Sequence, residues 1–384
     1  MIGERDLATV YDSQGLKAPP CAAMPAPRRK AVPLPYMDSL RAIAILGVVL
    51  GHCPTLAFGA PENMGRLASF AVALVDGWTA LFVFVSGFLF HHVSLSHFTY
   101  PEFITGKVRR LLIPYAVCTF VLLLVEQGQR LVEIGIQQQG LAWTANAFAA
   151  LFATTLLSGQ VGASMWYIPF VMMIFILAPA FVRFAKAPRT LQIILLIAAF
   201  LVGMTVNRSS GNADKIQNVV YFLFFFLAGV GCSENRTLFE RVLRHRWVAA
   251  SLWLSTIALA AVITRENLLW AFYDSWFAWH GVNYDYLIKI TLLLALCSTL
   301  LCWPALNAGR LKSLARDSFG LFFVHNLPLS ILFIFAQPRT PLIETGIPIL
   351  NLALIYALVL GSSVLVIKLV QRLAGRKSAL LIGA

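Results

Sequence analysis

Three ionisable residues share one face of the first apolar segment of this 384-residue chain. Asp38 lies three residues before Arg41, and His52 lies eleven residues after it. On an α-helix this spacing places the acid, the guanidinium and the imidazole on one stripe, with His52 about 16 Å beyond Arg41 along the axis. Ionisable groups within lipid are costly and by default mark function. An imidazole exchanges protons near neutral pH, so the stripe predicts a functional site at His52.

Each member of the stripe also has a structural interpretation. Asp38 and Arg41 could form an ion pair at the membrane interface, with the arginine reaching outward. His52 could be satisfied by a neighbouring helix. His325, in a late apolar segment, is open to the same two interpretations, and we take it as the second catalytic candidate. Asp76 could be an interfacial cap or the partner of a histidine.

A basic cluster of Lys107, Arg109 and Arg110 precedes the sequence LLIPY. Such a cluster can simply anchor membrane topology. It can also bind phosphate, because arginine forks match phosphate oxygens and a helix N-terminus adds a favourable dipole. The second interpretation predicts a nucleotide-like cofactor on the cytoplasmic face.

An aromatic segment, RENLLWAFYDSWFAWHGVNYDY, connects two late apolar runs. Its rings could form an aromatic belt at the level of the lipid headgroups. Alternatively they form a carbohydrate platform, since flat rings stack on sugar faces while carboxylates bind hydroxyls. Trp276 and Asp274 are the substrate-binding candidates of this segment. Lys289 follows it near the outer end of the next helix, and we expect its side chain to reach outward.

Composition explains where these residues must sit. Hydrophobic residues make up 59% of the chain and charged residues only 12%, whereas a soluble domain carries about 25% charged residues. The net charge is +13, but the basic residues fall in short clusters between apolar runs, which argues against nucleic acid as a partner. The six cysteines show no metal-binding spacing, so we expect no metal and interpret them as small buried hydrophobes.

The apolar runs predict an all-α fold, a polytopic membrane helix bundle with about ten transmembrane helices spanning 38–373. Residues 1–37, polar and proline-rich, are expected to be a disordered cytoplasmic tail, and 374–384 a second cytoplasmic tail. A weaker stretch, 141–157, is interpreted as interfacial or re-entrant. The ten runs are 39–58, 68–92, 111–126, 164–182, 190–206, 217–233, 247–264, 284–304, 318–336 and 346–371.

Charge in the connecting segments predicts the orientation of this bundle. When the segments are assigned alternately to two sides, one side holds 20 basic residues and the other holds six. Because basic residues stay in the cytoplasm, both termini are predicted to be cytoplasmic. No internal repeat stands out, so the inverted repeat of many transporters is not visible.

Several ordered motifs resemble the acyltransferase 3 family of integral-membrane acyltransferases. Lys107 stands where the family more often has arginine, and Phe319 and Phe323 replace its usual tyrosines. The matches, in chain order, are YMDSLRAIAILGVVLGH with the Arg41-to-His52 spacing, LFVFVSGFLF with Ser86, KVRRLLIP, MWYIPF at Trp166, and DSFGLFFVHNLP with His325.

The resemblance implies transfer of an acyl group from cytoplasmic acyl-CoA, with acetyl-CoA as the expected donor, to a sugar hydroxyl of a cell-surface, exported or lipid-linked glycan. His52 would then deprotonate the acceptor hydroxyl or carry the acyl group, while Asp38 and Arg41 fix the stripe around it and contact the donor. The implied setting is a multi-pass protein of a bacterial inner membrane whose partners are lipid, acyl-CoA and the glycan.

The same resemblance suggests roles for the remaining candidates. Lys107, Arg109 and Arg110 would bind CoA phosphates, while Ser86 and Trp166 would contact substrate.

Two other classes of function share parts of this pattern. A glycan or anion transporter would also have buried charges and ten helices, but no pair of broken helices lies in matching halves. A membrane sensor or scaffold would not need an Arg/His stripe. Consumption of acetyl-CoA by the purified protein separates the enzyme from both.

Overall fold

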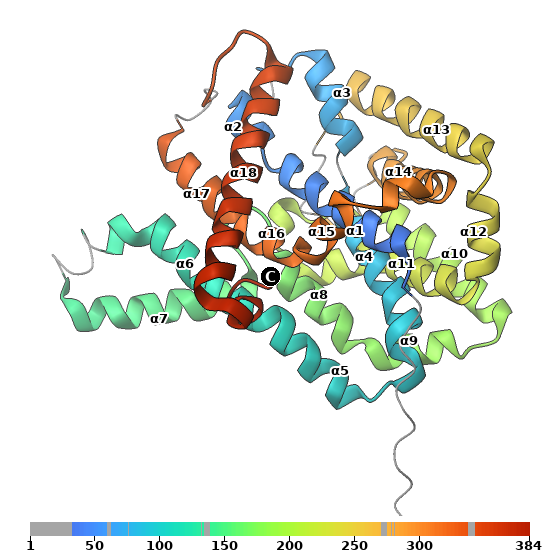
Figure 1. Ribbon diagram of the computed structural model, residues 1–384, viewed down its shortest axis with the longest axis horizontal. Helices are drawn as coiled ribbons and strands as arrows, with labels where there is room; N and C mark the ends of the chain where they lie inside the picture. The colour runs from blue at the N-terminus through green and yellow to red at the C-terminus, as the bar shows by residue number, and fades with distance from the viewer. Residues whose placement is uncertain are drawn as a thin grey trace, which may run out of the picture. The chain divides into compact units, whose positions relative to one another are not determined.

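The computed structural model folds into helices joined by turns and short loops (Figure 1). It contains no β-strand among the residues it describes. Those residues are 33–59, 63–75, 77–131, 133, 139–269, 275–277, 279, 281–336 and 342–384. The α-helices are α1 (Pro35–Gly51), α2 (Pro54–Phe58), α3 (Arg66–Val75), α4 (Trp78–Leu89), α5 (Tyr100–Lys107), α6 (Ile113–Arg130), α7 (Leu141–Ser158), α8 (Tyr167–Ile176), α9 (Ala178–Ala185), α10 (Arg189–Thr205), α11 (Lys215–Glu234), α12 (Arg236–Leu243), α13 (Arg246–Arg265), α14 (Tyr284–Cys302), α15 (Arg310–Arg316), α16 (Ser318–Val324), α17 (Asn326–Phe335), α18 (Pro348–Ala374) and α19 (Ser378–Leu381).

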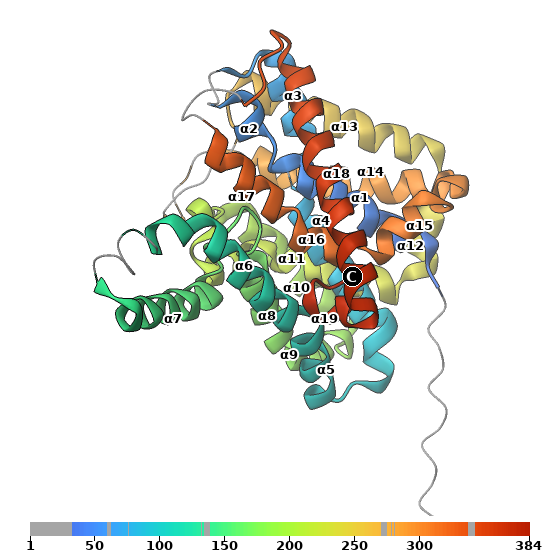
Figure 2. The same ribbon diagram turned by 60° about the vertical axis from the view of Figure 1, so that its left-hand side comes forward.

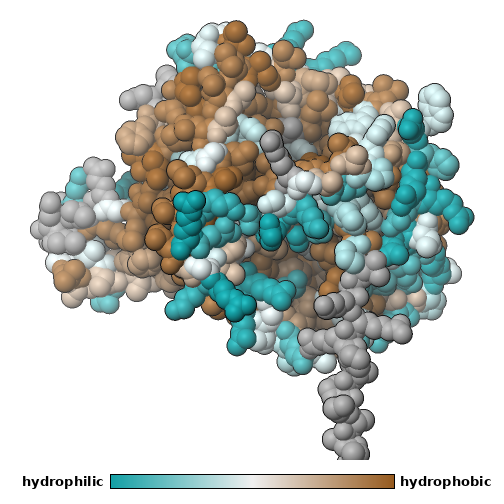
Figure 3. All heavy atoms as spheres, viewed as in Figure 1, coloured by the Kyte–Doolittle hydropathy of each residue, from teal (hydrophilic) through white to brown (hydrophobic). Residues whose placement is uncertain are grey.

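The helices are long and apolar enough to confirm a membrane bundle. Among the described residues nine helical stretches could each cross a bilayer by length and composition, and the bent pair α8–α9 brings the total to ten. Large apolar side chains point outward, as on α18, where Leu365 is 70% and Leu373 is 79% exposed. Figure 3 shows apolar side chains covering the part of this face that lies over α17 and α18. Lipid is the solvent that such a face requires. The side of the membrane on which the termini lie stays a prediction of the charge pattern.

Helix α7 packs against α6, and the two lie side by side in both ribbon views (Figures 1 and 2). The Tyr115 hydroxyl donates to the Thr155 carbonyl near the end of α7 (3.1 Å). After α7 the chain contacts α6 again, where the Gly162 N–H donates to the Glu126 carboxylate (3.1 Å). Tyr115 is midway along the 29-residue stretch Tyr100–Gly128. Helix α7 is also long and apolar enough to span a membrane, so the interfacial or re-entrant interpretation of 141–157 stays a prediction.

Helices α4 and α11 approach each other closely, and glycines make this possible. A Cβ on Gly87 would collide with the Phe226 carbonyl, and one on Gly229 would collide with the Phe84 carbonyl. Small residues at such crossings let two helix backbones touch, which is the main way that membrane helices pack. The glycine of the Ser-Gly-Phe motif therefore has a packing role.

The last residues of the chain fold back onto the bundle. After α18 a short turn leads into α19, where the Ser378 hydroxyl donates to the Ala384 carbonyl (2.6 Å). Ile382 is buried, and a Cβ on Gly320 would collide with Ala384. The last residues thus pack on the transmembrane helices, and their assignment as a cytoplasmic tail stays a prediction. The N-terminal residues 1–32 lie outside the described residues.

Candidate active site

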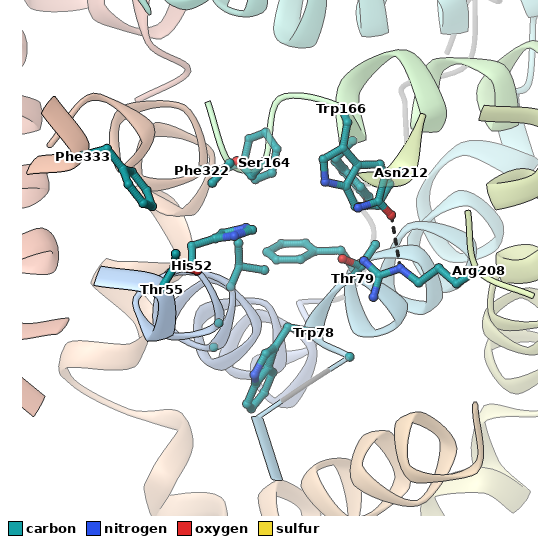
Figure 4. A pocket seen from close by; sticks show the side chains of 17 residues that line it. His52, Thr55, Trp78, Thr79, Ser164, Trp166, Arg208, Asn212, Phe322 and Phe333 are labelled. Carbon is teal, nitrogen blue, oxygen red and sulfur yellow. Dashed lines mark hydrogen bonds between the residues drawn. The ribbon is translucent and has the colours of Figure 1, made fainter. Parts of the chain in front are cut away.

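A cavity of about 340 Å³ lies where α1 ends and the loop before α8 begins (Figure 4). Aromatic rings make up much of its wall, and hydroxyl groups, one imidazole and one guanidinium complete it. A largely apolar hollow with a few convergent polar groups is typical of a small-ligand site. The lining residues are Gly47, Val48, Gly51, His52, Thr55, Gly77, Trp78, Thr79, Phe82, Ala163, Ser164, Trp166, Tyr167, Arg208, Asn212, Phe322 and Phe333.

His52 enters this cavity from a break in the first transmembrane segment. We expected a histidine inside a continuous helix over 39–58, and that detail is wrong: α1 ends at Gly51 and α2 starts at Pro54. Proline has no N–H, so the regular hydrogen bonding cannot continue. The backbone tightens instead, with the His52 N–H donating to Val49 (3.2 Å) and the Cys53 N–H to Leu50 (3.1 Å). The break leaves the imidazole at a helix end beside the cavity.

His325 stacks on His52, although the two residues come from opposite ends of the sequence. The ring centroids are 5.7 Å apart and the ring planes differ by 23°. Nδ1 of His325 lies 2.8 Å from the Leu321 carbonyl oxygen, which can only accept, so Nδ1 carries the hydrogen. In the neutral ring Nε2 then holds the lone pair, and this buried atom has no hydrogen-bond partner among the described residues. His325 therefore presents an unused base beside His52.

Asn326 fixes the loop that forms the opposite wall. Its Oδ1 accepts from the backbone N–H groups of Ala163 and Ser164 (both 2.9 Å), and its Nδ2 donates to the Ser164 hydroxyl (2.9 Å). Gly162 has a φ of +57°, and a Cβ there would press against the Asn326 side chain. One buried amide thus holds the backbone that leads to Trp166.

Asp38 and Arg41 lie at the other end of α1. Arg41 donates to the Ala315 carbonyl (2.8 Å) and pairs with Asp38 (3.4 Å). Arg41 contacts Ala315 and His52 contacts His325, so both reach the late segment of the chain, and their common stripe stays a prediction of helical periodicity. The structure does not bring the ion pair to the cavity, and Arg41 joins α1 to the α15–α16 junction.

The basic cluster also lies apart from the cavity, because none of its three members lines it. Arg109 and Arg110 are exposed on the π-helical turn Val108–Leu112. The Lys107 ammonium instead packs over the Phe103 and Phe175 rings, at 5.1 and 4.1 Å from their centroids.

The substrate candidates fall into three groups. Trp166 lines the cavity. Ser86 does not line it but interacts with the hydroxyl of Tyr167, which does. The Trp276 indole donates to Asp214 (3.1 Å), so it braces the loop before α11 without lining the cavity. Asp274 and Asp76 lie outside the described residues.

Sequence reasoning missed Arg208, the guanidinium that faces the cavity from the loop between α10 and α11 (Figure 4). We had counted it only as one of the six basic residues on the side poor in positive charge. A hint was present, because an arginine on that side serves no purpose in setting topology. Its convergence with His52 depends on tertiary packing that sequence spacing does not reveal.

The prediction for Lys289 is wrong. Its side chain is fully buried and pairs with Asp285, whose carboxylate also accepts from the Tyr221 hydroxyl (3.0 Å). The carboxylate lies one helical turn before the lysine and neutralises it locally, so the ammonium does not need to reach the surface.

Comparison with known families decides what class of protein has this architecture. The model of the acyltransferase domain of the acyltransferase 3 family matches residues 34–368, nearly the whole chain. The chain belongs to this family. The membrane acyltransferase domain therefore includes α1 with His52, the loop with Trp166 and the late segment with His325. No curated protein and no solved structure matches the chain. Among the described residues, no group of three or more His, Cys, Asp or Glu side chains could hold a metal ion.

Proposed function

We propose that this membrane acyltransferase moves an acyl group from cytoplasmic acyl-CoA, specifically acetyl-CoA, to a hydroxyl of an exported polysaccharide or lipid-linked glycan in a bacterial inner membrane. The observation that carries this proposal is the pair of stacked imidazoles of His52 and His325 at an aromatic cavity inside the membrane domain. Two adjacent imidazoles provide a base that works near neutral pH. Acyl transfer to a hydroxyl needs such a base.

The proposed reaction proceeds at His52. The acceptor O–H bond breaks as its proton passes to an unprotonated imidazole nitrogen. The acceptor oxygen then forms a bond to the thioester carbon, the C–S bond breaks, and the imidazolium returns the proton to the CoA thiolate. A base of this kind typically accelerates a reaction by about 10²–10⁴-fold.

The chemistry of the cavity wall supports a sugar acceptor. Trp166 and Trp78 line it with aromatic rings, while Thr55 and Thr79 provide hydroxyl groups for hydrogen bonds. His325 lies behind His52 with its buried Nε2 lone pair, so it can orient the catalytic ring or take the proton in a second step. In this proposal Asp38 and Arg41 act indirectly, because they fix the helix that leads to His52.

The donor's CoA moiety is assigned to the cytoplasmic basic cluster. Arg109 and Arg110 are exposed, so their forks can reach phosphate oxygens. Lys107 sits over two rings and contributes positive charge nearby.

The proposal is tested with the purified protein in lipid nanodiscs, acetyl-CoA labelled in the acetyl group, and surface glycan extracted from cells that lack this protein. We expect label in the glycan and release of free CoA in equal amounts. Label without CoA release, or movement of glycan across vesicles without either product, would contradict the proposal and favour a transporter.

A further inference from the structure

The cavity contains a positively charged side chain that its surroundings hold in place. This charge indicates which chemical group the acceptor carries besides its hydroxyl. Among the described residues that line the cavity, Arg208 is the one with a permanent charge, and no carboxylate lines it. Figure 4 shows Arg208 and His52 entering from different elements on either side of the cavity. A guanidinium at a catalytic cavity usually recognises a planar or tetrahedral anion.

The surrounding loop is held so firmly that the guanidinium has a defined direction. The Asn207 N–H donates to the Trp276 carbonyl (2.8 Å), its amide donates to Ser275 (2.9 Å), and its own carbonyl accepts from the buried Gln217 amide (2.8 Å). On the far side of Arg208, Asp214 accepts from the Trp276 indole (3.1 Å). These contacts tie the loop to the aromatic segment on both sides of the arginine.

The arginine itself is oriented by a hydrogen bond and by two rings. Its Nε donates to the Asn212 side chain (3.1 Å), and Asn212 adopts an uncommon positive φ of 53° to present that oxygen. The guanidinium carbon lies 5.7 Å from the Trp166 ring and 5.8 Å from the Phe222 ring. Such rings favour a cation in a poorly solvated place. Among the described residues, the buried Asp285 carboxylate pairs with Lys289 and accepts from the Tyr221 hydroxyl (3.0 Å).

We propose that Arg208 binds an anionic group of the acceptor, a sugar carboxylate or a sugar phosphate, while the ring of that sugar stacks on Trp166 and its hydroxyl meets His52. This inference rests on the proposed acyl transfer and narrows its acceptor to acidic glycans. Both anions present the oxygen pair that the fork matches. The aromatic wall and the fixed guanidinium are then one recognition site, which selects the sugar before the base acts.

The test treats the acceptor glycan chemically and leaves the enzyme unchanged. Glycan from cells that lack the protein is divided into an untreated sample, one with its carboxylates reduced to alcohols, and one treated with phosphatase. We expect label from acetyl-CoA in the untreated sample and loss of at least nine-tenths of it in one treated sample, which identifies the anion. Full labelling after both treatments overturns the inference but leaves acyl transfer standing. Absence of label and of CoA release with the untreated sample means that the proposed function itself fails.

Variants of the arginine give an independent measurement. Arg208→Gln should raise the KM for the acceptor by at least about tenfold, since hydrogen bonds to charged groups are stronger than those between neutral groups. The KM for acetyl-CoA should stay within about twofold, and Arg208→Lys, which keeps charge but loses the fork, should lie between Gln and the wild type. Arg265→Gln is the matched control, because Arg265 is an exposed arginine at the end of α13 (85% exposed). An equal fall in kcat for the glycan and for hydrolysis of acetyl-CoA by water would assign Arg208 to the reacting carbonyl and overturn acceptor recognition.

Discussion

Arg41 and His52 belong to the same predicted stripe, but the polar groups at the two ends of α1 have different surroundings. At one end an Arg41 Nη atom donates to the Ala315 carbonyl and pairs with Asp38, so the guanidinium joins two parts of the fold away from the cavity. At the other end the helix breaks, and His52 faces a cavity with His325 stacked on it and a buried Nε2 left without a partner. A polar group that contacts a distant part of the chain ties the fold together, whereas a buried lone pair beside a cavity is open to a ligand or a proton. The comparison assigns structure to the Arg41 end and chemistry to the His52 end.

The variant expected to break this comparison most strongly is His325→Asn. Asparagine can still donate to the Leu321 carbonyl, as Nδ1 does now, but it has no basic nitrogen at the position of Nε2. We expect transfer to fall by about 10²-fold or more while expression and thermal unfolding stay near those of the wild type. Near-normal activity of His325→Asn would make His325 a structural hydrogen-bonding residue.

A second variant tests the structural role of Arg41 at the other end of α1. Arg41→Ala removes a charged donor from the α15–α16 junction, and we expect a loss of about 1.5–3 kcal/mol in the free energy of unfolding, seen as a lower midpoint of thermal unfolding in detergent. The exposed arginine variant Arg265→Ala should leave that midpoint unchanged. Arg41→Ala with full stability and no activity would move Arg41 to the catalytic group.

The cytoplasmic cluster should show a smaller and more selective effect. Replacing Arg109 and Arg110 by glutamate reverses two charges beside the assigned CoA site, so the KM for acetyl-CoA should rise about tenfold with little change in the KM for the acceptor. Steady-state kinetics with each substrate varied in turn measures both. If the KM for acetyl-CoA does not change and insertion is normal, the cluster serves only as a topology anchor.

The smallest effect is expected from Trp276→Phe. It removes one hydrogen bond to Asp214 and keeps most of the ring, so the loop with Arg208 loses a tether worth about 1 kcal/mol. We expect a rise of a few-fold in the KM for the acceptor. A change in the KM for acetyl-CoA alone would contradict the bracing role.

Hydropathy could predict the bundle because lipid imposes one simple rule on every helix, namely that its outward face is apolar. The shared face of Arg41 and His52 was equally accessible, since it depends on helical periodicity alone. Pro54 could in principle have predicted the helix break at His52. The apolar pattern continues through this position, however, and gives no sign of a break. Arg208 could not be found in this way, because the cavity forms only when the α10–α11 loop packs near the end of α1. Lys289 shows the same limit, since a buried pair and an outward-reaching lysine look alike in sequence.

The most direct test of the central claim compares wild-type protein with His52→Ala and His52→Gln in the labelled acetyl-CoA assay. Glutamine keeps a hydrogen-bonding side chain at the mouth of the cavity but cannot take a proton. We predict that both variants insert at normal levels and lose detectable transfer, a fall of at least about 10²-fold. Near-normal transfer by His52→Gln would contradict the account and make His325 the leading base.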